Sequence, residues 1–513
     1  MKKLLSVILS AAVSASAFSM MPGTAPENCR NVLTAEAGSG ASGICTDTIR
    51  WMLDFDGTLY IKGTGSIPDY KILYDSNDEV DMGAAPPWYY FHDDIKKVSV
   101  SDNITHIGSF AFYGCKNLAS ASLPKTVRDL GVSAFSECTG LRSIALPDSV
   151  TGIPEDLFSG CSSLQSVTIP NSVKELGEKA FYCCTSLKSV KIPSSVTAVS
   201  DYLFKGCYSL SEIDVPSSVK EIGLYAFDST TWLENKRKAN PLVIVNGILI
   251  DGQKCSGNVV IPGSVNTINQ YAFSECTGLR NVTVPRSVRS VQRAAFMRCT
   301  ALQTVSLPDT IDTISEQAFA WCGSLSGITV PETVKSIGWE AFIGCSAIKN
   351  IYLPSAVSSI GTRAFSQCKN LSSVTIENKN CSISYGTSTF SNTGSEGNYN
   401  YTGVIKGYSG STAEQYAKEF SRKFSVIPLK LKGDIDGNGI VNAVDASKIL
   451  VKCTELASPD AALPSADVIA KYDMNGDGLI SSVDASLLLA YCANLENAPD
   501  LTFDTFFKNL RNE

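Results

Sequence analysis

The segment PETVKSIGWEAFIGCSAIKNIYL, residues 331–353, decides the fold of this 513-residue chain, because its pattern recurs along the sequence. At a period of 23 residues, one unit reads roughly Pro-x-Ser-Val-x-x-Ile-Gly-x-x-Ala-Phe-x-x-Cys-x-x-Leu-x-x-Val-x-Ile. A fixed period of this length is typical of a solenoid, in which each repeat forms one coil and stacks on its neighbours. The sequence therefore predicts a solenoid of 23-residue repeats.

Three columns of residues keep the register. Ten cysteines share it, namely Cys115, Cys138, Cys161, Cys184, Cys207, Cys276, Cys299, Cys322, Cys345 and Cys368. Prolines such as Pro308 and phenylalanines such as Phe319 follow the same period. The 46 residues from Pro216 to Pro262 equal two periods and keep apolar residues in the expected columns, so we predict a degenerate repeat in register there.

Each unit contains one short strand. In Val167-Thr168-Ile169 two β-branched residues face one side and a polar residue faces the other, because side chains alternate along a strand. Stacked units would pair these strands in parallel at a spacing of about 4.8 Å. The Phe, Leu, Val and Ile columns would then fill the axis of the solenoid.

The cysteine column has three interpretations. Buried free thiols that pack as small hydrophobic groups are the preferred one. Disulfides between neighbouring coils are a second, since a Cα separation of about 5 Å permits the bond. A metal-binding array is a third, but no histidine accompanies the thiols.

With its Ile-Gly-x-x-Ala-Phe-x-x-Cys-x-x-Leu core, as from Ile337 to Cys345, the repeat resembles the BspA-like branch of bacterial leucine-rich repeats. The resemblance covers roughly residues 44–428. It implies a β-rich N-terminal cap over residues 44–100, in which residues 51–65 form a hairpin, and a repeat solenoid over residues 101–376. It also implies a C-terminal cap over residues 377–428, in which residues 407–418 form a closing helix.

After the repeats, residues 434–445 have the residue types of a twelve-residue calcium loop. Positions 1, 3, 5, 7, 9 and 12 are Asp434, Asp436, Asn438, Ile440 through its carbonyl, Asn442 and Asp445, with Gly439 at the sharp turn. The pattern recurs 39 residues later as Asp473, Asn475, Asp477, Leu479 through its carbonyl, Ser481 and Asp484, with Gly478 at the turn. Matched helices are expected after both loops, and two calcium ions are the predicted cofactors.

The paired loops resemble a type I-like dockerin, a small all-α module with two F-hand calcium loops, here at residues 433–497 with a tail at 498–513. The resemblance implies that the module binds a cohesin on the scaffold protein of a cellulosome. Loop positions 10 and 11, which contact cohesin in that family, are Ala443, Val444, Ser482 and Val483. The best-studied members have Ser-Thr pairs there, so these positions depart from the family pattern. The near-identity of the two halves indicates that either could face the partner.

The N-terminus predicts secretion. Lys2 and Lys3 precede an apolar run from Leu4 to Phe18, so residues 1–21 are read as a signal peptide and processing region. The run is shorter than the roughly 18 to 20 residues needed to span a bilayer, and no later run reaches that length. We therefore expect an extracellular protein, associated with a cell-surface cellulosome, with no transmembrane segment after signal removal.

Charge and histidine content exclude several functions. The net charge of −7, without a long Lys/Arg block, excludes nucleic acid as the partner. The chain has two histidines, His92 and His106, whereas Ser or Cys nucleophiles need a nearby histidine base. Carboxylates outside the calcium loops lie at variable repeat positions, and the repeats leave no room for a catalytic domain. The chain is therefore predicted not to be an enzyme.

The remaining function is binding or adhesion. Only Tyr352 is aromatic in the outward strand column, so an extracellular protein is the first choice of solenoid ligand. The predicted surface is Lys191, Asp214 and Arg237, which place unlike charges in one ladder. The alternatives are a carbohydrate-binding solenoid and an unrecognised polysaccharide-processing enzyme subunit of the cellulosome.

Overall fold

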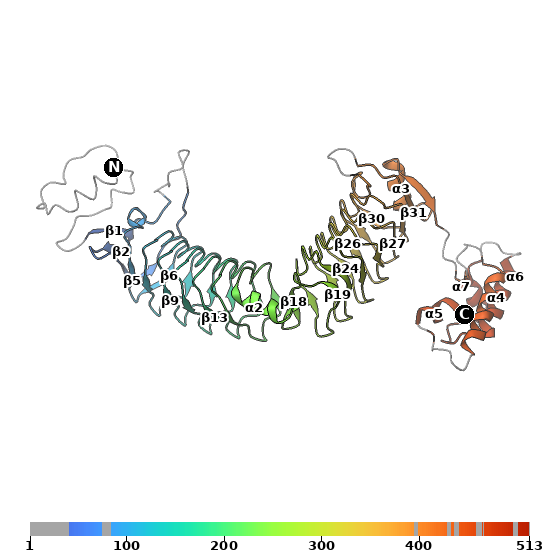
Figure 1. Cartoon of the computed structure of the whole chain (residues 1–513), viewed down its shortest axis with the longest axis horizontal. Coiled ribbons are helices and arrows are strands. Elements are labelled where there is room, and N and C mark those ends of the chain that lie inside the picture. The colour runs from blue at the N-terminus through green and yellow to red at the C-terminus, as the bar shows by residue number, and fades with distance from the viewer. Residues whose placement is uncertain are drawn as a thin grey trace, which may run out of the picture. The chain divides into compact units, whose positions relative to one another are not determined.

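The computed structural model describes residues 40–73, 84–393, 399–427, 432–435, 441–457, 464, 466–495 and 501–511. The chain divides into two compact units, Met1–Leu302 and Gln303–Glu513. The first holds the N-terminal cap and the earlier coils, and the second holds the later coils, the C-terminal cap and a helical module (Figure 1). The predicted signal region lies outside the described residues.

The N-terminal cap is an antiparallel meander of β1 (Ala41–Thr46), β2 (Ile49–Leu53) and β3 (Thr58–Gly63). Strand β3 then pairs in parallel with β5 (Lys97–Val100), so the meander covers the end of the first coil. Trp88, which precedes the short helix η2 (Tyr89–Phe91), is buried and stacks on Phe112 at 6.0 Å. The cap thus closes the apolar axis.

The coils of the first unit carry two series of parallel strands. The predicted series continues from β5 through β7 (Ser120–Ser122), β9 (Ser143–Ala145), β11 (Ser166–Thr168), β13 (Ser189–Lys191), β15 (Glu212–Asp214), β19 (Gly257–Val260) and β21 (Leu279–Thr283). A second series, which the sequence did not predict, begins with β4 (Gly65–Ser66) and β6 (Ile104–Ile107). It continues as β8 (Asp129–Leu130), β10 (Gly152–Ile153), β12 (Glu175–Leu176), β14 (Ala198–Val199), β16 (Glu221–Ile222), β20 (Thr267–Ile268) and β22 (Ser290–Val291). The solenoid fold is confirmed.

The second unit continues both series. The first comprises β23 (Thr304–Ser306), β25 (Gly327–Ile328), β27 (Asn350–Leu353) and β29 (Ser373–Ile376), and the second β24 (Thr313–Ile314), β26 (Ser336–Ile337), β28 (Ser359–Ile360) and β30 (Ser382–Ile383). Strands β31 (Val404–Gly407) and β32 (Lys423–Val426) extend the first series in parallel, and helix α3 (Thr412–Glu419) lies between them. Helix α3 is the closing helix that the sequence predicted.

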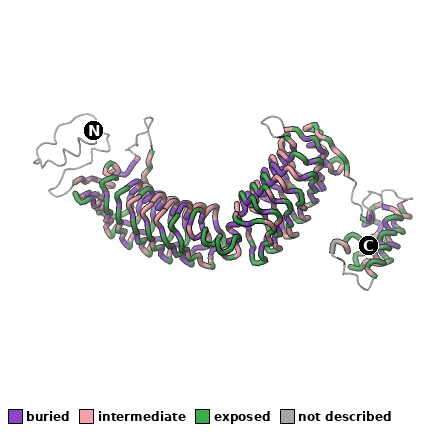
Figure 2. Tube along the Cα trace, viewed as in Figure 1, coloured by how far each residue is buried: buried purple, intermediate pink, exposed green. Residues whose placement is uncertain are grey.

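A column of stacked phenylalanines fills the axis in each unit. In the second unit Phe319, Phe342 and Phe365 are fully buried, and their consecutive ring centroids lie 5.4 and 5.2 Å apart. Phe390 continues the column at 5.7 Å from Phe365, although it lies outside the 23-residue register. Buried positions accordingly recur in every coil (Figure 2).

The cysteines serve the coil-to-coil contact. All ten in-register cysteines are buried free thiols. The Cys345 thiol donates to the Phe319 carbonyl of the preceding coil at 3.1 Å, and Cys161 does the same to Phe135 at 3.1 Å. Burial raises the pKa of the Cys368 thiol to about 12, so this group stays protonated at neutral pH. The preferred interpretation, a ladder of buried free thiols, agrees with this packing.

Two backbone requirements explain the repeated glycines. A Cβ at Gly338 would lie 2.5 Å from the backbone nitrogen of Glu316 in the preceding coil, so a side chain there would hold the coils apart. Gly344, directly before Cys345, has a φ of +72°, in the left-handed region that glycine adopts without steric cost. The glycines therefore mark close approach and turn geometry.

One coil of the first unit is irregular. Thr230 occupies the cysteine column, and its hydroxyl accepts a hydrogen bond from the Leu233 amide at 3.1 Å. This N-cap begins helix α2 (Thr231–Ala239), which stands where a strand was expected. An antiparallel hairpin of β17 (Val243–Val245) and β18 (Ile248–Asp251) follows. The predicted strand position of Arg237 is therefore wrong, because the capped helix replaces that strand.

The C-terminal module consists of α4 (Ala443–Leu456), α5 (Ala466–Tyr472), α6 (Ser482–Leu495) and α7 (Phe503–Arg511). Its core includes Ile449 and Leu488, which are equivalent positions of α4 and α6. Phe503 and Phe506 of α7 are buried against Tyr491 at 5.1 and 5.6 Å. The module therefore continues past residue 497, where the sequence predicted a tail.

Phe319→Ala should lower the free energy of unfolding by about 3–5 kcal/mol, because it leaves a cavity in the stacked column. Urea unfolding of the full chain, followed by circular dichroism, measures this loss. Thr329→Ala, at an exposed position directly after β25, is the control and should change stability by less than about 0.5 kcal/mol. Equal losses in the two variants would contradict the packing role of Phe319.

Candidate functional site

The second calcium loop, between α5 and α6, is described throughout. Asp484 at its last position accepts hydrogen bonds from the amides of Met474 and Ser481, each at 2.8 Å. Asp473 at the first position accepts from the amides of Gly476 and Gly478 at 2.6 and 2.8 Å. The two ends of the loop are thus held by its own carboxylates. Gly478 has a φ of +82°, which agrees with the predicted sharp turn.

The first loop repeats this geometry in its described part. Asp445 accepts hydrogen bonds from the amides of Ile435 and Asn442 at 2.8 and 2.9 Å, as Asp484 does in the second loop. Asn442 caps α4 by accepting from the Val444 amide at 2.7 Å. Asp434 is described, whereas Asp436, Asn438 and Ile440 lie outside the described residues.

The second loop fits a hard cation. Asp484 is fully buried and Asp473 is 8% exposed, and burial of an ionised carboxylate is costly without a compensating charge or hydrogen bonds. Its predicted ligands are oxygen atoms, the type that calcium prefers. Within the described ranges, no three or more His, Cys, Asp or Glu side chains are grouped so that they could hold a metal ion. In this arrangement the aspartates accept amide hydrogens instead.

The predicted cohesin-binding residues are exposed and equivalent in the two halves. Ala443 and Val444 begin α4, and Ser482 and Val483 begin α6. Val444 and Val483 are each 52% exposed. The structure adds a pair that the sequence analysis missed, Leu450 and Leu489, which are 43% and 44% exposed. The 39-residue spacing of the loops could have identified this pair, since an apolar residue recurs there outside the core.

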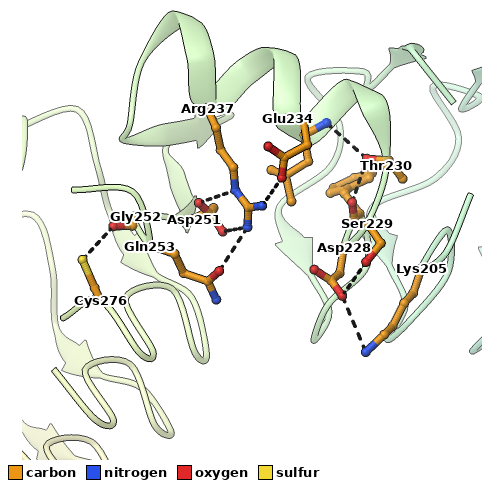
Figure 3. A network of polar contacts seen from close by, with 12 residues as sticks. Lys205, Asp228, Ser229, Thr230, Glu234, Arg237, Asp251, Gly252, Gln253 and Cys276 are labelled. Atoms are coloured by element: carbon orange, nitrogen blue, oxygen red, sulfur yellow. Dashed lines mark hydrogen bonds and ion pairs between the residues drawn. The ribbon is translucent and has the colours of Figure 1, made fainter. Parts of the chain in front are cut away.

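The predicted solenoid surface is only partly brought together. Lys191 of β13 and Asp214 of β15 are exposed partners in the parallel register. Arg237 instead lies on α2, where its guanidinium donates to Asp251 through Nε at 3.0 Å and to Gln253 at 3.2 Å (Figure 3). It also pairs with Glu234 of the same helix. Arg237 therefore ties α2 to the hairpin after it.

The histidines do not form a catalytic triad. His106 Nε2 lies 3.6 Å from Asp69, and the Ser109 hydroxyl donates to the same carboxylate oxygen at 2.8 Å. A triad needs the histidine between the nucleophile and the acid, whereas here Asp69 lies between Ser109 and His106. His92 contacts the Tyr89 carbonyl at 2.7 Å. Among the helices of the described segments, none has the length and apolar character needed to cross a membrane.

These features define a class: a parallel β-solenoid protein with a C-terminal module of paired calcium-type loops. Comparison with protein families assigns both parts. The BspA type leucine-rich repeat region matches residues 88–210, 130–245, 252–371 and 292–403, which together cover more than half of the chain. The dockerin type I domain matches residues 432–492. The chain therefore belongs to the BspA-type leucine-rich repeat family and carries a dockerin.

Similar solved structures are bacterial leucine-rich repeat proteins. One from Eubacterium ventriosum is 24% identical, with 63% of this chain and 94% of that chain covered and a TM-score of 0.40. A leucine-rich cell surface protein from Faecalibacterium prausnitzii is 26% identical, with 68% and 97% covered and a TM-score of 0.37. One from Bacteroides ovatus is 23% identical, with 75% and 99% covered and a TM-score of 0.37. No curated protein matches the chain.

Dockerin type I domains bind calcium in general, and a dockerin implies binding to a cohesin. Together with the repeat solenoid, this supports a cohesin-docking protein of a non-catalytic, adhesion type.

Proposed function

We propose that this protein is a secreted, non-catalytic binding protein that its dockerin attaches to a cohesin on a cellulosome scaffold. The observation that carries the proposal is the repetition of one loop-helix unit in the module. Asp445 and Asp484 accept equivalent amide hydrogens, and the helices that follow expose equivalent apolar residues. Such duplication supports a module that can present either half to a partner.

Two calcium ions are proposed to order the loops. Asp434, Asp436, Asn438, Ile440, Asn442 and Asp445 would hold one, and Asp473, Asn475, Asp477, Leu479, Ser481 and Asp484 the other. Each loop concentrates three carboxylates that repel one another. The ion would supply the positive charge that offsets this repulsion, and so couple binding to folding of the module.

The cohesin contact is proposed to be mainly apolar. Val444, Leu450 and Val451 are exposed on α4, as are Val483 and Leu489 on α6. Exposed apolar residues on a small module are an unfavourable surface in water and a favourable one in an interface. Ala443 and Ser482 lie beside the valines at the helix starts. The Ser-Thr pairs of well-studied dockerins are absent here, so the cohesin should present a complementary apolar face.

Secretion is proposed from residues 1–21. Their basic start, apolar run and small residues have the character of a signal peptide. Export would place the dockerin where an extracellular scaffold can bind it. The buried thiols are compatible with an oxidising environment, because their burial keeps them from reagents in solution.

The solenoid is proposed to bind an extracellular protein through the strand face that holds Lys191 and Asp214. The two residues lie on adjacent parallel strands, and unlike charges at that separation give a patch that favours specific encounter.

Lys191→Ser with Asp214→Ser should weaken capture of extracellular proteins by the immobilised chain at least fivefold. Ser306→Ala with Thr329→Ala, in β23 and directly after β25, is the control elsewhere on the solenoid. Unchanged capture by the charge variant would remove this part of the proposal.

Calcium should be required for cohesin binding. Titration calorimetry of the full chain should count two calcium ions, and Asp434→Ala with Asp473→Ala should abolish both calcium and cohesin binding. The solenoid's thermal transition should persist in that variant, because neither residue contributes to the coils. Asp129→Ala with Asp148→Ala, at exposed solenoid positions, is the matched control. Full cohesin affinity in excess chelator would refute the proposal.

The duplicated surface makes a separate prediction. Val444→Asp or Val483→Asp alone should weaken cohesin binding by only about twofold, because the other half remains available. The double variant should lose about a hundredfold or more, since a charge would then be buried in either orientation. Val426→Asp, an exposed valine of β32, should have no effect. Surface plasmon resonance can measure cohesin binding by the two single variants, the double variant and the control. A complete loss of cohesin binding in one single variant would show that only that half binds.

A further inference from the structure

A groove of about 740 Å³ lies beside the irregular coil of the first unit. Ser200, Asp201, Lys220 and Glu221 line it from the coils that precede α2. Gln270 and Gln292 line it from the coils that follow the β17–β18 hairpin. The groove is thus built by segments up to 114 residues apart, from Glu178 to Gln292, on the two sides of the irregular coil.

The repeat itself changes at the groove. Asn269 and Gln292 occupy the position that is glycine in many other coils, where a Cβ would meet the backbone of the preceding coil. Side chains with amide groups replace glycine at this position in the two coils that follow the β17–β18 hairpin. Asn269 reaches back across 47 residues and donates to the Ile222 carbonyl at 2.8 Å, whereas Gln292 lines the groove. Both residues place amides at a position that is glycine in several coils and Pro154 or Ser315 in others.

The lining of the groove exposes more polar than apolar surface. Gln270, Gln292 and Ser200 are half-buried and carry groups that both donate and accept. The apolar lining residues Val199 and Ile248 are each 2% exposed, so they offer no surface that could anchor a protein side chain. The carboxylates of Glu178, Asp201 and Glu221 outnumber the one ammonium, that of Lys220, which disfavours an anionic ligand.

Two tyrosines border the adjoining crevice, which shares Asn269 and Gln270 with the groove. The rings of Tyr225 and Tyr271 lie 5.4 Å apart, although 46 residues separate them in the sequence. Burial raises the pKa of Tyr225 to about 12, so its hydroxyl remains a hydrogen-bond donor at neutral pH. Aromatic edges beside amides and carboxylates suit a ligand that has both hydroxyl groups and C–H faces.

We propose that this groove binds a neutral, hydroxyl-rich polysaccharide chain. Amides and carboxylates would bind sugar hydroxyls, and Tyr225 and Tyr271 would contact the sugar rings. The site lies apart from the Lys191–Asp214 strand face, so it stands independently of the proposed protein ligand. It is also distinct from the outward strand column that holds Tyr352, since Tyr225 and Tyr271 precede the Ala-Phe pair of their coils.

Calorimetry of the full chain with cellohexaose, xylohexaose and mannohexaose tests the site. At least one hexaose should bind, and Gln270→Ala with Gln292→Ala should weaken that binding at least tenfold. Gln165→Ala with Gln303→Ala, which removes two exposed glutamines elsewhere on the solenoid, should leave it within twofold. Tyr225→Leu, in the adjoining crevice, is a second variant, and it should also weaken binding while the thermal transition stays cooperative.

The absence of binding to any hexaose at about 1 mM, the weakest range that such a site would occupy, would overturn the proposal. Equal weakening of binding in the groove variant and in its glutamine control would do the same. Tighter binding of polygalacturonate than of every neutral hexaose would also overturn it. Cohesin binding is measured in the same preparations. Because the dockerin has no residue in the groove, a loss of hexaose binding with normal cohesin binding concerns the groove alone.

Discussion

The close approach of consecutive coils is the constraint on which the solenoid depends. At Gly338 the backbone of one coil comes so near the next that a Cβ would lie 2.5 Å from a backbone nitrogen. The other contacts follow from that spacing. Thr333 and Ser172 each donate at 2.6 Å to a carbonyl of the coil before, and the cysteine thiols do the same deeper in the core. Repetition in the sequence is therefore repetition of coil-to-coil contacts.

The irregular coil shows what happens when the constraint is relaxed. Thr230 replaces a cysteine of the column and caps a helix instead of continuing the coil. Arg237 then bonds Asp251 and Gln253, which holds the helix against the next hairpin (Figure 3). In the coils that follow, Asn269 and Gln292 stand at the register position of Gly338, and Asn269 donates to the Ile222 carbonyl. The departure from the repeat thus coincides with a groove that residues on both sides of it line.

The dockerin follows a different principle, internal duplication instead of stacking. Its two halves bury Ile449 and Leu488 at equivalent positions and expose Leu450 and Leu489 one residue later. This alternation leaves an apolar surface on each half. Helix α7 adds Phe503 and Phe506 to the core, so the module closes with residues beyond the duplicated part. The proposed docking and ligand-binding surfaces therefore lie in separate parts of the chain.

The sequence by itself determined the solenoid, its period, the buried columns and both loop-helix units, because each depends on local spacing that recurs. Asp473 and Asp484 could be assigned to one loop from their separation alone. Only the tertiary structure decided the position of Arg237, the pairing of Tyr225 with Tyr271 and the burial of Phe503. These depend on contacts between segments of unlike sequence, and no periodicity encodes such contacts. A single N-cap at Thr230 outweighed the 23-residue register there, since a capped helix satisfies its own backbone without a neighbouring strand.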